Sequence, residues 1–269
     1  MKILENSKPG AKVIAIANQK GGVGKTTTAF NLGIGLARQG KKVLIIDSDA
    51  QGNLTSCMGI DEPDKLEDTL ASIMGMLMGD GKVEPGFAIM EHEENVSFVP
   101  GNIDLSSIEV ALVNAMGREY ILKEYISIIA PYFDFILLDT MPSLGMMTVN
   151  ALTAADSVLI PVQTQYLSLR GLEQLIASIM KVKQKLNPGL AFEGILLTMV
   201  DARTNFAREI MGLVHGNYGR RIPVFERHIP MSVRAAETAA EGKSIFVHDP
   251  KGKVAAAYSL LAEEVLAHA

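Results

Sequence analysis

The sequence predicts an α/β fold, a doubly wound and mostly parallel β-sheet flanked by helices. Short apolar runs rich in β-branched residues recur along the 269 residues, and segments with helical periodicity separate them. The runs do not alternate with polar residues, as expected for parallel strands that are covered by helices on both faces. Alternation of strand and helix is typical of doubly wound sheets.

Each predicted strand is one of these apolar runs. The first, Lys12–Asn18, reads KVIAIAN and leads into a glycine-rich loop. None of the runs is long enough to span a bilayer. The other predicted strands are Lys42–Asp47, Phe135–Asp139, Ser157–Pro161 and Gly194–Val200.

Helices are expected between and after these strands. The first covers Lys25–Gln39 and ends near Gly40, and a long one, Ser168–Leu186, is stopped by Asn187-Pro188-Gly189. The remaining predicted helices are Thr204–His215, Ser232–Glu241 and Lys251–His268.

Residues 61–118 do not follow this alternation, and we interpret them as a variable helical excursion between core strands. Asp61–Gly101 is rich in Asp, Glu, Gly and Pro and contains a methionine-rich apolar segment, Leu70–Met78. Methionine side chains fill gaps in cores, so core packing is favoured over a partner surface. Without an internal repeat or a linker, residues 1–269 are expected to form a single domain.

Composition narrows the class of protein. Hydrophobic residues make up 48% and charged residues 20%, which is typical of a folded chain. The single cysteine, Cys57, excludes an intrachain disulfide and a four-cysteine metal site on one chain, and it favours a reducing, cytoplasmic setting. Met1–Ala11 is too polar for a signal peptide. Because the net charge is −5, any binding to nucleic acid must come from a local basic patch.

The loop after the first strand has the composition of a phosphate site. It reads Lys20-Gly21-Gly22-Val23-Gly24-Lys25-Thr26-Thr27 and leads directly into a helix. Glycines let backbone N–H groups face phosphate oxygens, and the helix N-terminus adds a positive dipole end. We expect Lys25 at the β- and γ-phosphates, Thr26 on Mg²⁺ and Thr27 at the α-phosphate. The general P-loop pattern has glycine where this chain has Gln19, and Lys20 stands beside it.

Three aspartates follow predicted strands. Asp139 ends the run Ile136-Leu137-Leu138, where a carboxylate would hold Mg²⁺ through water, as in a Walker B strand. Asp47 and Asp49 follow the second strand. There, an aspartate is placed to position an attacking water or to reach the surroundings of the metal. The alternative for each of the three is a helix cap or a turn.

Several motifs together resemble the ParA/Soj family of chromosome- and plasmid-partition ATPases. They are the loop Ala17–Thr28, Asp47-Ser48-Asp49-Ala50-Gln51-Gly52-Asn53, Leu137–Leu144, Pro161-Val162-Gln163, Leu196–Thr204, and Ile229-Pro230 with Val233-Arg234. The resemblance covers roughly residues 12–60 and 134–268. The loop with Lys20 is specific for the wider deviant Walker A group, and the later motifs narrow it to the ParA/Soj branch.

The resemblance implies functions that the residues alone do not show. In this family the lysine at the place of Lys20 reaches across a nucleotide-sandwich homodimer to the partner's phosphates, so ATP binding and dimerisation are coupled. Gly21 would stay small because two chains approach there. Slow ATP hydrolysis assisted by Asp49, stimulation by a ParB-like protein, and a cytoplasmic, nucleoid-associated location are also implied.

The family further implies binding to double-stranded DNA without sequence preference, with Arg203 and Arg234 as the best-matched positions. Between Asp201 and Arg234 there are six arginines against three acidic residues, a local balance of +3. Phosphate contacts of this kind are the main source of non-specific affinity. The chain departs from the family at Met231, a commonly basic position, and at Met141, where a proline is common. The alternative is an ordinary solvated surface.

Adenine is favoured over guanine as the base. Guanine readout usually needs Asn/Thr-Lys-x-Asp, and Thr198-Met199-Val200-Asp201 has methionine in place of the lysine. We expect the adenine to be held by Met199, Pro230 and Val233.

Three other classes of protein are alternatives to a partition ATPase. A MinD-like membrane-cycling ATPase would need a basic amphipathic C-terminal helix, whereas this chain ends in the acidic segment Ala262–Ala269, so no membrane partner is expected. An iron–sulfur reductase that shares a cluster across a homodimer needs two cysteines per chain, and this chain has only Cys57. A ParA-like ATPase that positions another cargo, such as a conjugation or secretion complex, stays open.

Overall fold

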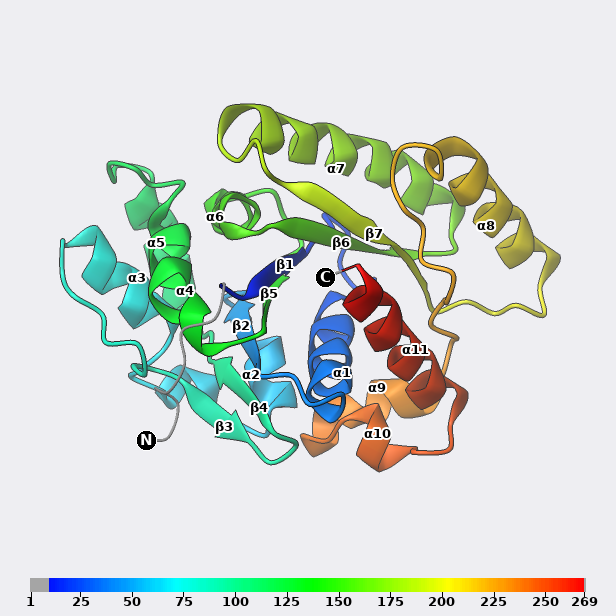
Figure 1. Ribbon diagram of the computed structural model, residues 1–269, viewed down its shortest axis with the longest axis horizontal. Helices are drawn as coiled ribbons and strands as arrows, with labels where there is room; N and C mark the ends of the chain where they lie inside the picture. Colours follow the sequence, from blue (N-terminus) through cyan, green and yellow to red (C-terminus); the bar gives the residue numbers. More distant parts are fainter. Residues whose placement is uncertain (1–9, 269) are drawn as a thin grey trace.

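A seven-stranded sheet forms the centre of the computed structural model, which describes residues 10–268 without the side chains of residues 166–170, 236 and 239–240 (Figure 1). The strand order is β3-β4-β2-β5-β1-β6-β7, and every pair is parallel except β3 with β4. The strands are β1 (Lys12–Ile16), β2 (Val43–Ser48), β3 (Met90–His92), β4 (Val96–Val99), β5 (Phe135–Thr140), β6 (Ser157–Gln163) and β7 (Ala191–Thr198).

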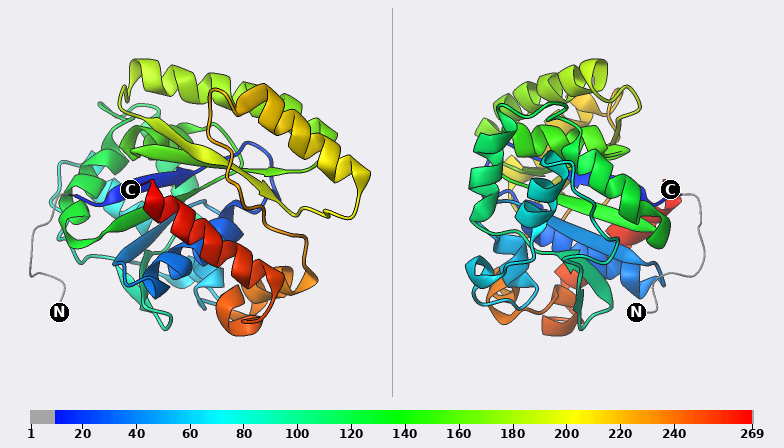
Figure 2. Two further views of the ribbon diagram at one scale, coloured as in Figure 1. Left: turned by 45° about the vertical axis from the view of Figure 1, so that its right-hand side comes forward. Right: turned by 90° about the vertical axis from the view of Figure 1, so that its left-hand side faces the viewer.

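Helices cover both faces of this sheet. The described helices are α1 (Lys25–Arg38), α2 (Asn53–Cys57), α3 (Leu70–Met78), α4 (Asp104–Leu112), α5 (Ile121–Ile129), α6 (Met146–Ala154), α7 (Tyr166–Lys185), α8 (Asn205–Tyr218), α9 (Val233–Glu241), α10 (Ile245–His248) and α11 (Lys253–Ala267), with short 3₁₀ turns at Pro63–Lys65 and Ala130–Tyr132. One apolar cluster packs α3–α8 on one face, and a second packs α1, α2, α10 and α11 on the other. Figures 1 and 2 show α7 and α8 on the opposite side of the sheet from α1 and α11.

The register brings the predicted site residues together. β5 lies between β2 and β1, with Asp139 directly opposite Asp47 on one side and Ile16 on the other. Because the three strands are parallel, their carboxyl ends meet at one edge of the sheet, where ligands bind in doubly wound folds. The glycine-rich loop starts at this edge.

The predicted fold class is confirmed, and all ten predicted strands and helices are present with ends within three residues of the expected ones. The largest differences are at β7, which starts at Ala191 instead of Gly194, and at α8, which continues to Tyr218. Residues 191–193 include a charged side chain, Glu193, and this obscured the start of the strand.

The interpretation of residues 61–118 as a helical excursion is right for α3 and α4 but wrong for the short edge strand β3 and for Val96–Val99. Val96–Val99 is β4, a buried strand that pairs in parallel with β2 inside the sheet. It has only four residues and follows an acidic turn, with Asn95 at a φ of 61°. Such a short strand gives little periodic signal. Within α3, Met74 is fully buried, as expected for core packing.

The edge strand β7 carries a bulge that depends on one glycine. Phe192 pairs with Val158 and Gly194 with Leu159, so Glu193 is the extra residue. The buried carboxylate of Glu193 accepts hydrogen bonds from Lys12 Nζ at 2.9 Å and Ser157 Oγ at 2.6 Å. Gly194 has a φ of +157°, and a Cβ there would lie 2.8 Å from the ring of Phe225. Both features exclude a side chain at this position.

We expect Gly194→Ala to lower the free energy of unfolding by about 2 kcal/mol or more, because backbone strain and overlap with Phe225 act together. The matched control is Gly212→Ala at an exposed position of α8, where a Cβ meets nothing within 4 Å. There the higher helix propensity of alanine should raise the free energy of unfolding by as much as about 1 kcal/mol. Urea denaturation of both variants measures this. Equal stabilities of the two variants would contradict the role of the bulge.

Candidate functional site

The glycine-rich loop connects β1 to α1 with the backbone that a phosphate site requires. Gly22 and Gly24 have φ values of 70° and 87°, which side chains disfavour, and Gly24 forms the N-cap of α1. No side chain caps this helix end. Its N–H groups therefore face the loop, as expected for binding an anion.

Three hydrogen bonds from polar side chains, one of them Asn18 in the loop itself, anchor this loop to the ends of β6 and β7. Asn18 Nδ2 donates to the carbonyl of Pro161 at 2.6 Å. Gln163 Nε2 donates to the carbonyl of Gly22 at 2.6 Å, and Thr198 Oγ1 donates to that of Val23 at 2.8 Å. The ends of β6 and β7 thus fix the shape of the loop. Sequence reasoning did not assign these residues to the site; the available signal was a polar side chain at the end of a buried strand.

Lys25 and Thr26 begin α1 beside the carboxyl end of β5. Lys25 is buried, and its Nζ donates to the carbonyl of Lys20 at 3.4 Å. Burial lowers the pKa of Lys25, and the nearby carboxylates of Asp139 and Asp49 partly oppose that shift. The structure therefore brings Lys25 together with two of the three predicted aspartates, Asp139 and Asp49.

Asp139 lies fully buried at this point without a hydrogen-bond partner for either carboxylate oxygen in the described chain. Burial, with repulsion from Asp47, raises its pKa well above the usual value, and the adjacent Thr26 hydroxyl and Lys25 ammonium partly oppose the rise. Buried polar groups are normally paired, so an unpaired buried carboxylate indicates a missing ligand.

This arrangement fits Mg²⁺ bound together with a nucleotide. Among the described residues no group of three or more acidic, histidine or cysteine side chains could hold a metal. Mg²⁺ in phosphate sites typically takes only one or two protein oxygens, and phosphates and waters complete its octahedron. The carboxylate of Asp139 and the hydroxyl of Thr26 are suitable oxygen donors.

Asp47 is buried next to Asp139 but has its own partners. Its Oδ2 accepts from the backbone N of Thr55 at 2.8 Å and from Thr55 Oγ1 at 2.7 Å. Its Oδ1 accepts from the backbone N of Asp49 at 3.2 Å. Burial raises the pKa of Asp47 to about 6 despite these hydrogen bonds. Asp47, expected at the metal site, is thus held by both carboxylate oxygens in the framework that links β2 to α2.

Asp49 lies on the loop between β2 and α2 and is buried, with 8% of its surface exposed. Its Oδ1 accepts from the backbone N of Gln51 at 3.0 Å, which leaves its second oxygen for another partner. It is close enough to Lys25 to raise the pKa of that amine. Its position beside the phosphate loop is compatible with orienting a water.

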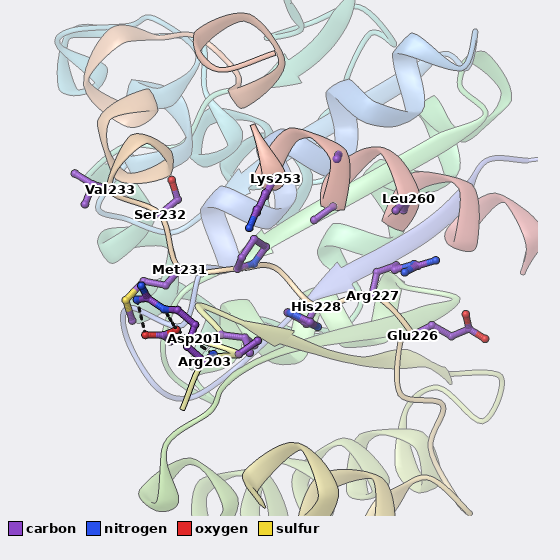
Figure 3. Close-up of a pocket in the computed structure, with 15 residues that line it drawn as sticks. Asp201, Arg203, Glu226, Arg227, His228, Met231, Ser232, Val233, Lys253 and Leu260 are labelled. Atoms are coloured by element: carbon purple, nitrogen blue, oxygen red, sulfur yellow. Dashed lines mark hydrogen bonds and ion pairs between the residues drawn. The ribbon is translucent and has the colours of Figure 1, made fainter. Parts of the chain in front are cut away.

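A groove of about 790 Å³ opens beside the end of β7, between the segment 226–233 and α11 (Figure 3). Pro230 and Val233, two of the expected adenine contacts, line it. The third, Met199, lies nearer the phosphate loop, with its Cε 3.8 Å from where a Cβ of Gly24 would be. Its φ of 52° is unusual for a non-glycine residue. The three residues thus lie around the end of β7.

The two expected DNA contacts are exposed, and each is paired with an aspartate. Arg203 donates from Nε and Nη2 to Asp201 at 2.8 and 2.9 Å, with 90% of its side chain exposed. Arg234 Nη1 donates to Asp249 at 2.9 Å, with 62% exposed. In Figure 3 the Arg203 pair lies at one end of the groove and Arg227 toward the other. Exposed pairs of this kind are weak, so both guanidinium groups can exchange partners.

Comparisons with known proteins agree with this geometry. An AAA domain family model matches residues 11–192. The sporulation initiation inhibitor protein Soj of Bacillus subtilis is 43% identical over 96% of this chain and 99% of its own length. The chromosome partitioning protein ParA of Myxococcus xanthus is 42% identical over 95% of this chain and 88% of its own.

Among solved structures, cobyrinic acid a,c-diamide synthase from Mycobacterium smegmatis, with bound ADP and magnesium, superposes with a TM-score of 0.83. It is 38% identical and covers 96% of this chain and 95% of its own. No helix among residues 10–268 is long and apolar enough to cross a membrane.

The two buried carboxylates predict how the nucleotide-free fold responds to pH. A raised pKa means that the folded chain binds the proton more tightly than the unfolded chain. The contribution of Asp47 is therefore fully present below pH 3.8 and is lost as the pH rises through about 6, a change of about 3 kcal/mol. Asp139 acts in the same direction.

We expect Asp139→Asn to weaken the loss of unfolding free energy that accompanies a rise in pH above about 4, because the raised pKa of Asp139 contributes to that loss. At pH 8 it should stabilise the nucleotide-free chain, since the variant buries no charge at this position. Urea denaturation across this range measures the effect, with exposed Asp61→Asn as the control. A variant that is less stable than wild type at pH 8, or that has an unchanged slope, would refute this account.

Proposed function

Because the chain belongs to the ParA/Soj family of P-loop ATPases, we propose that it is a DNA-partitioning ATPase that works as an ATP-dependent dimer. Relatives at 42–43% identity along nearly the whole chain support this reading. The ATPase class itself is established by the family and by the site.

The observation that carries the proposal is the meeting of Lys25, Asp49 and the unpaired Asp139 beneath a loop that also presents Lys20. Lys25 and the loop N–H groups bind the β- and γ-phosphates. Mg²⁺, held by Thr26 and Asp139, would supply positive charge to the phosphate oxygens when bound. Asp49, which lies close to Lys25, orients the attacking water.

Lys20 and Gly21 make the dimer step chemically reasonable. Gly21 is exposed, and a Cβ there would meet nothing within 4 Å in the single chain. The single fold therefore does not require glycine here, whereas a closely approaching second copy does. A lysine supplied by that copy neutralises phosphate charge only in the dimer, so hydrolysis weakens the association.

DNA binding rests on Arg203 and Arg234 and on the local excess of three positive charges. The two guanidinium groups exchange Asp201 and Asp249 for DNA phosphates, and dimerisation doubles the number of contacts. A ParB-like protein is the expected stimulating partner, by family membership.

The backbone gives a route from the nucleotide to the DNA contacts. Val200 N donates to the carbonyl of Ile229 at 3.0 Å, and Met231 N donates to that of Val200 at 3.2 Å. The segment fixed by these bonds contains Pro230, which lines the groove beside the end of β7, and continues to Arg234 at the start of α9. A base bound against Pro230 thus acts on the same short segment that presents Arg234.

Amide synthesis, the activity named for the Mycobacterium smegmatis protein, is a second candidate because of the 38% identity. Amidation that draws nitrogen from glutamine needs an activated nucleophile, commonly cysteine. The single cysteine, Cys57, is buried, and burial raises the pKa of its thiol to about 12. Cys57 therefore cannot serve this chemistry, and the partition function is the better supported one.

The central test measures mass by light scattering and DNA retention by filter binding, with ATP, with ADP and without nucleotide. We expect dimers and retained DNA only with ATP. Asp49→Ala should preserve both because it slows hydrolysis without removing a phosphate ligand. If Asp49→Ala with ATP gave neither dimer nor retained DNA, the proposal would be abandoned. An adjacent ParB-like gene would distinguish partition from the positioning of another cargo.

Arg203→Ala and Arg234→Ala should each weaken DNA binding uniformly across sequences and reduce the slope of log affinity against log salt by about 1. The control is Arg118→Ala, an arginine in the connection between α4 and α5 that pairs with Glu119. Filter binding with unrelated duplexes at several salt concentrations measures both quantities. An equally large effect of Arg118→Ala would contradict the assignment of Arg203 and Arg234 as DNA contacts.

A further inference from the structure

Lys20, the residue that would reach the partner's phosphates, is engaged by its own chain. Its Nζ donates to Gln165 Oε1 at 2.7 Å and to Gln163 Oε1 at 3.5 Å. Both glutamines lie beyond or at the end of β6, more than 140 positions further along the sequence. The contact therefore depends on the fold and is not a local turn.

The backbone around Lys20 is held at both ends of the contact. Lys20 N donates to Asn18 Oδ1 at 3.0 Å. On the other side, Gln165 N donates to the carbonyl of Gln163 at 2.8 Å, which forms a tight turn before α7. Because both backbones are fixed, the ammonium and the two amide oxygens are placed opposite each other.

Gln163 also connects this contact to the rest of the nucleotide site. Its Nε2 donates to the carbonyl of Gly22 at 2.6 Å and lies 2.9 Å from Met199 Sδ. One side chain thus contacts the phosphate loop, the expected base contact and Lys20. A nucleotide that shifts the loop or Met199 also acts on the acceptor of Lys20.

The chemistry of the acceptors sets the strength of the contact. Gln165 is the N-cap residue of α7, where the positive end of the helix dipole disfavours a cation. Gln163 and Gln165 offer neutral amide oxygens, and a hydrogen bond from an ammonium to such an oxygen in a partly exposed place contributes modestly. The bond is strong enough to hold Lys20 and weak enough to release it.

From these contacts we propose that Gln163 and Gln165 form a latch that keeps Lys20 within its own chain and sets the threshold for dimerisation; this rests on the proposed function. Gln165 is the releasable acceptor, and Gln163 is a positioning residue that joins the latch to the phosphate loop. A second copy with bound ATP competes with the latch for Lys20. The concentration at which dimers form then depends on Gln165, although Gln165 need not touch the nucleotide.

The first experiment tests the latch without any dimer. The nucleotide-free chain is labelled briefly with acetic anhydride, and acetylation of Lys20 is measured by mass spectrometry against exposed Lys181 as an internal reference. We expect Gln165→Ala to increase the labelling rate about three- to tenfold, because a charge-assisted hydrogen bond is lost. Gln165→Glu should decrease it, since an ion pair replaces the amide contact. Exposed Gln184→Ala on α7 is the matched control.

The second experiment measures dimerisation by sedimentation velocity with a non-hydrolysable ATP analogue. Gln165→Ala should lower the protein concentration at half-dimerisation about three- to tenfold, and Gln165→Glu should raise it. The affinity for ADP should be unchanged in both, which separates a latch from damage to the nucleotide site. Lys20 labelling that is the same in all variants, or altered labelling with an unmoved dimerisation midpoint, would overturn the latch. If labelling differed between the variants and wild type as expected, but wild type never dimerised with ATP, the proposed function would be refuted instead.

Discussion

Burial of charge at the carboxyl ends of β2 and β5 is the constraint on which this structure depends. Asp47 and Asp139 lie side by side in the sheet, and Lys25 enters the same space from α1. A charge without water costs free energy unless other groups replace the water. Thr55 and the backbone of Asp49 do so for Asp47. For Asp139, the nearby Thr26 hydroxyl and Lys25 ammonium offset the cost of burial only in part. The nucleotide-free chain therefore keeps part of this cost at the point where a bound cation would remove it, and ligand binding and stability are coupled through one carboxylate.

The phosphate loop is held by side chains from other strands, and these contacts connect the site to the rest of the fold. Its carbonyl groups are bonded by Gln163 and Thr198, from β6 and β7, so a movement of the loop is felt at the ends of both strands. From β7 the connection continues through Val200 to the segment with Pro230 and Arg234. Two backbone hydrogen bonds between Val200 and the segment 229–231 make this connection. Gln163 at the end of β6 and the segment before α9 are thus two separate regions connected to one loop.

Much of this could be predicted from the sequence because the informative features are local. The central strands are continuous apolar runs, and the strand–loop–helix context identifies Lys25 and Asp139 without any tertiary information. β4 was missed because Val96–Val99 is only four residues long, and the start of β7 because a bulge places charged Glu193 inside it. Gln163 and Thr198 could not be assigned, since their roles are contacts to residues more than 140 positions away. For Asp47, the pattern could not separate a metal ligand from a framework residue, because the deciding partner, Thr55, is an unremarkable threonine on the next helix.

The buried state of Cys57 has a practical consequence for studying the molecule. The thiol is 6% exposed, and the neighbouring carboxylates Asp139 and Asp47 add to burial in disfavouring its thiolate. Thiol-specific dyes and spin labels react with thiolates at accessible positions, so the native cysteine is effectively silent toward them. A single cysteine introduced on the surface can therefore be labelled in an otherwise unaltered chain. Fluorescence or electron paramagnetic resonance can then follow motions of the loop and of α9 without first removing a side chain that packs beside the nucleotide site.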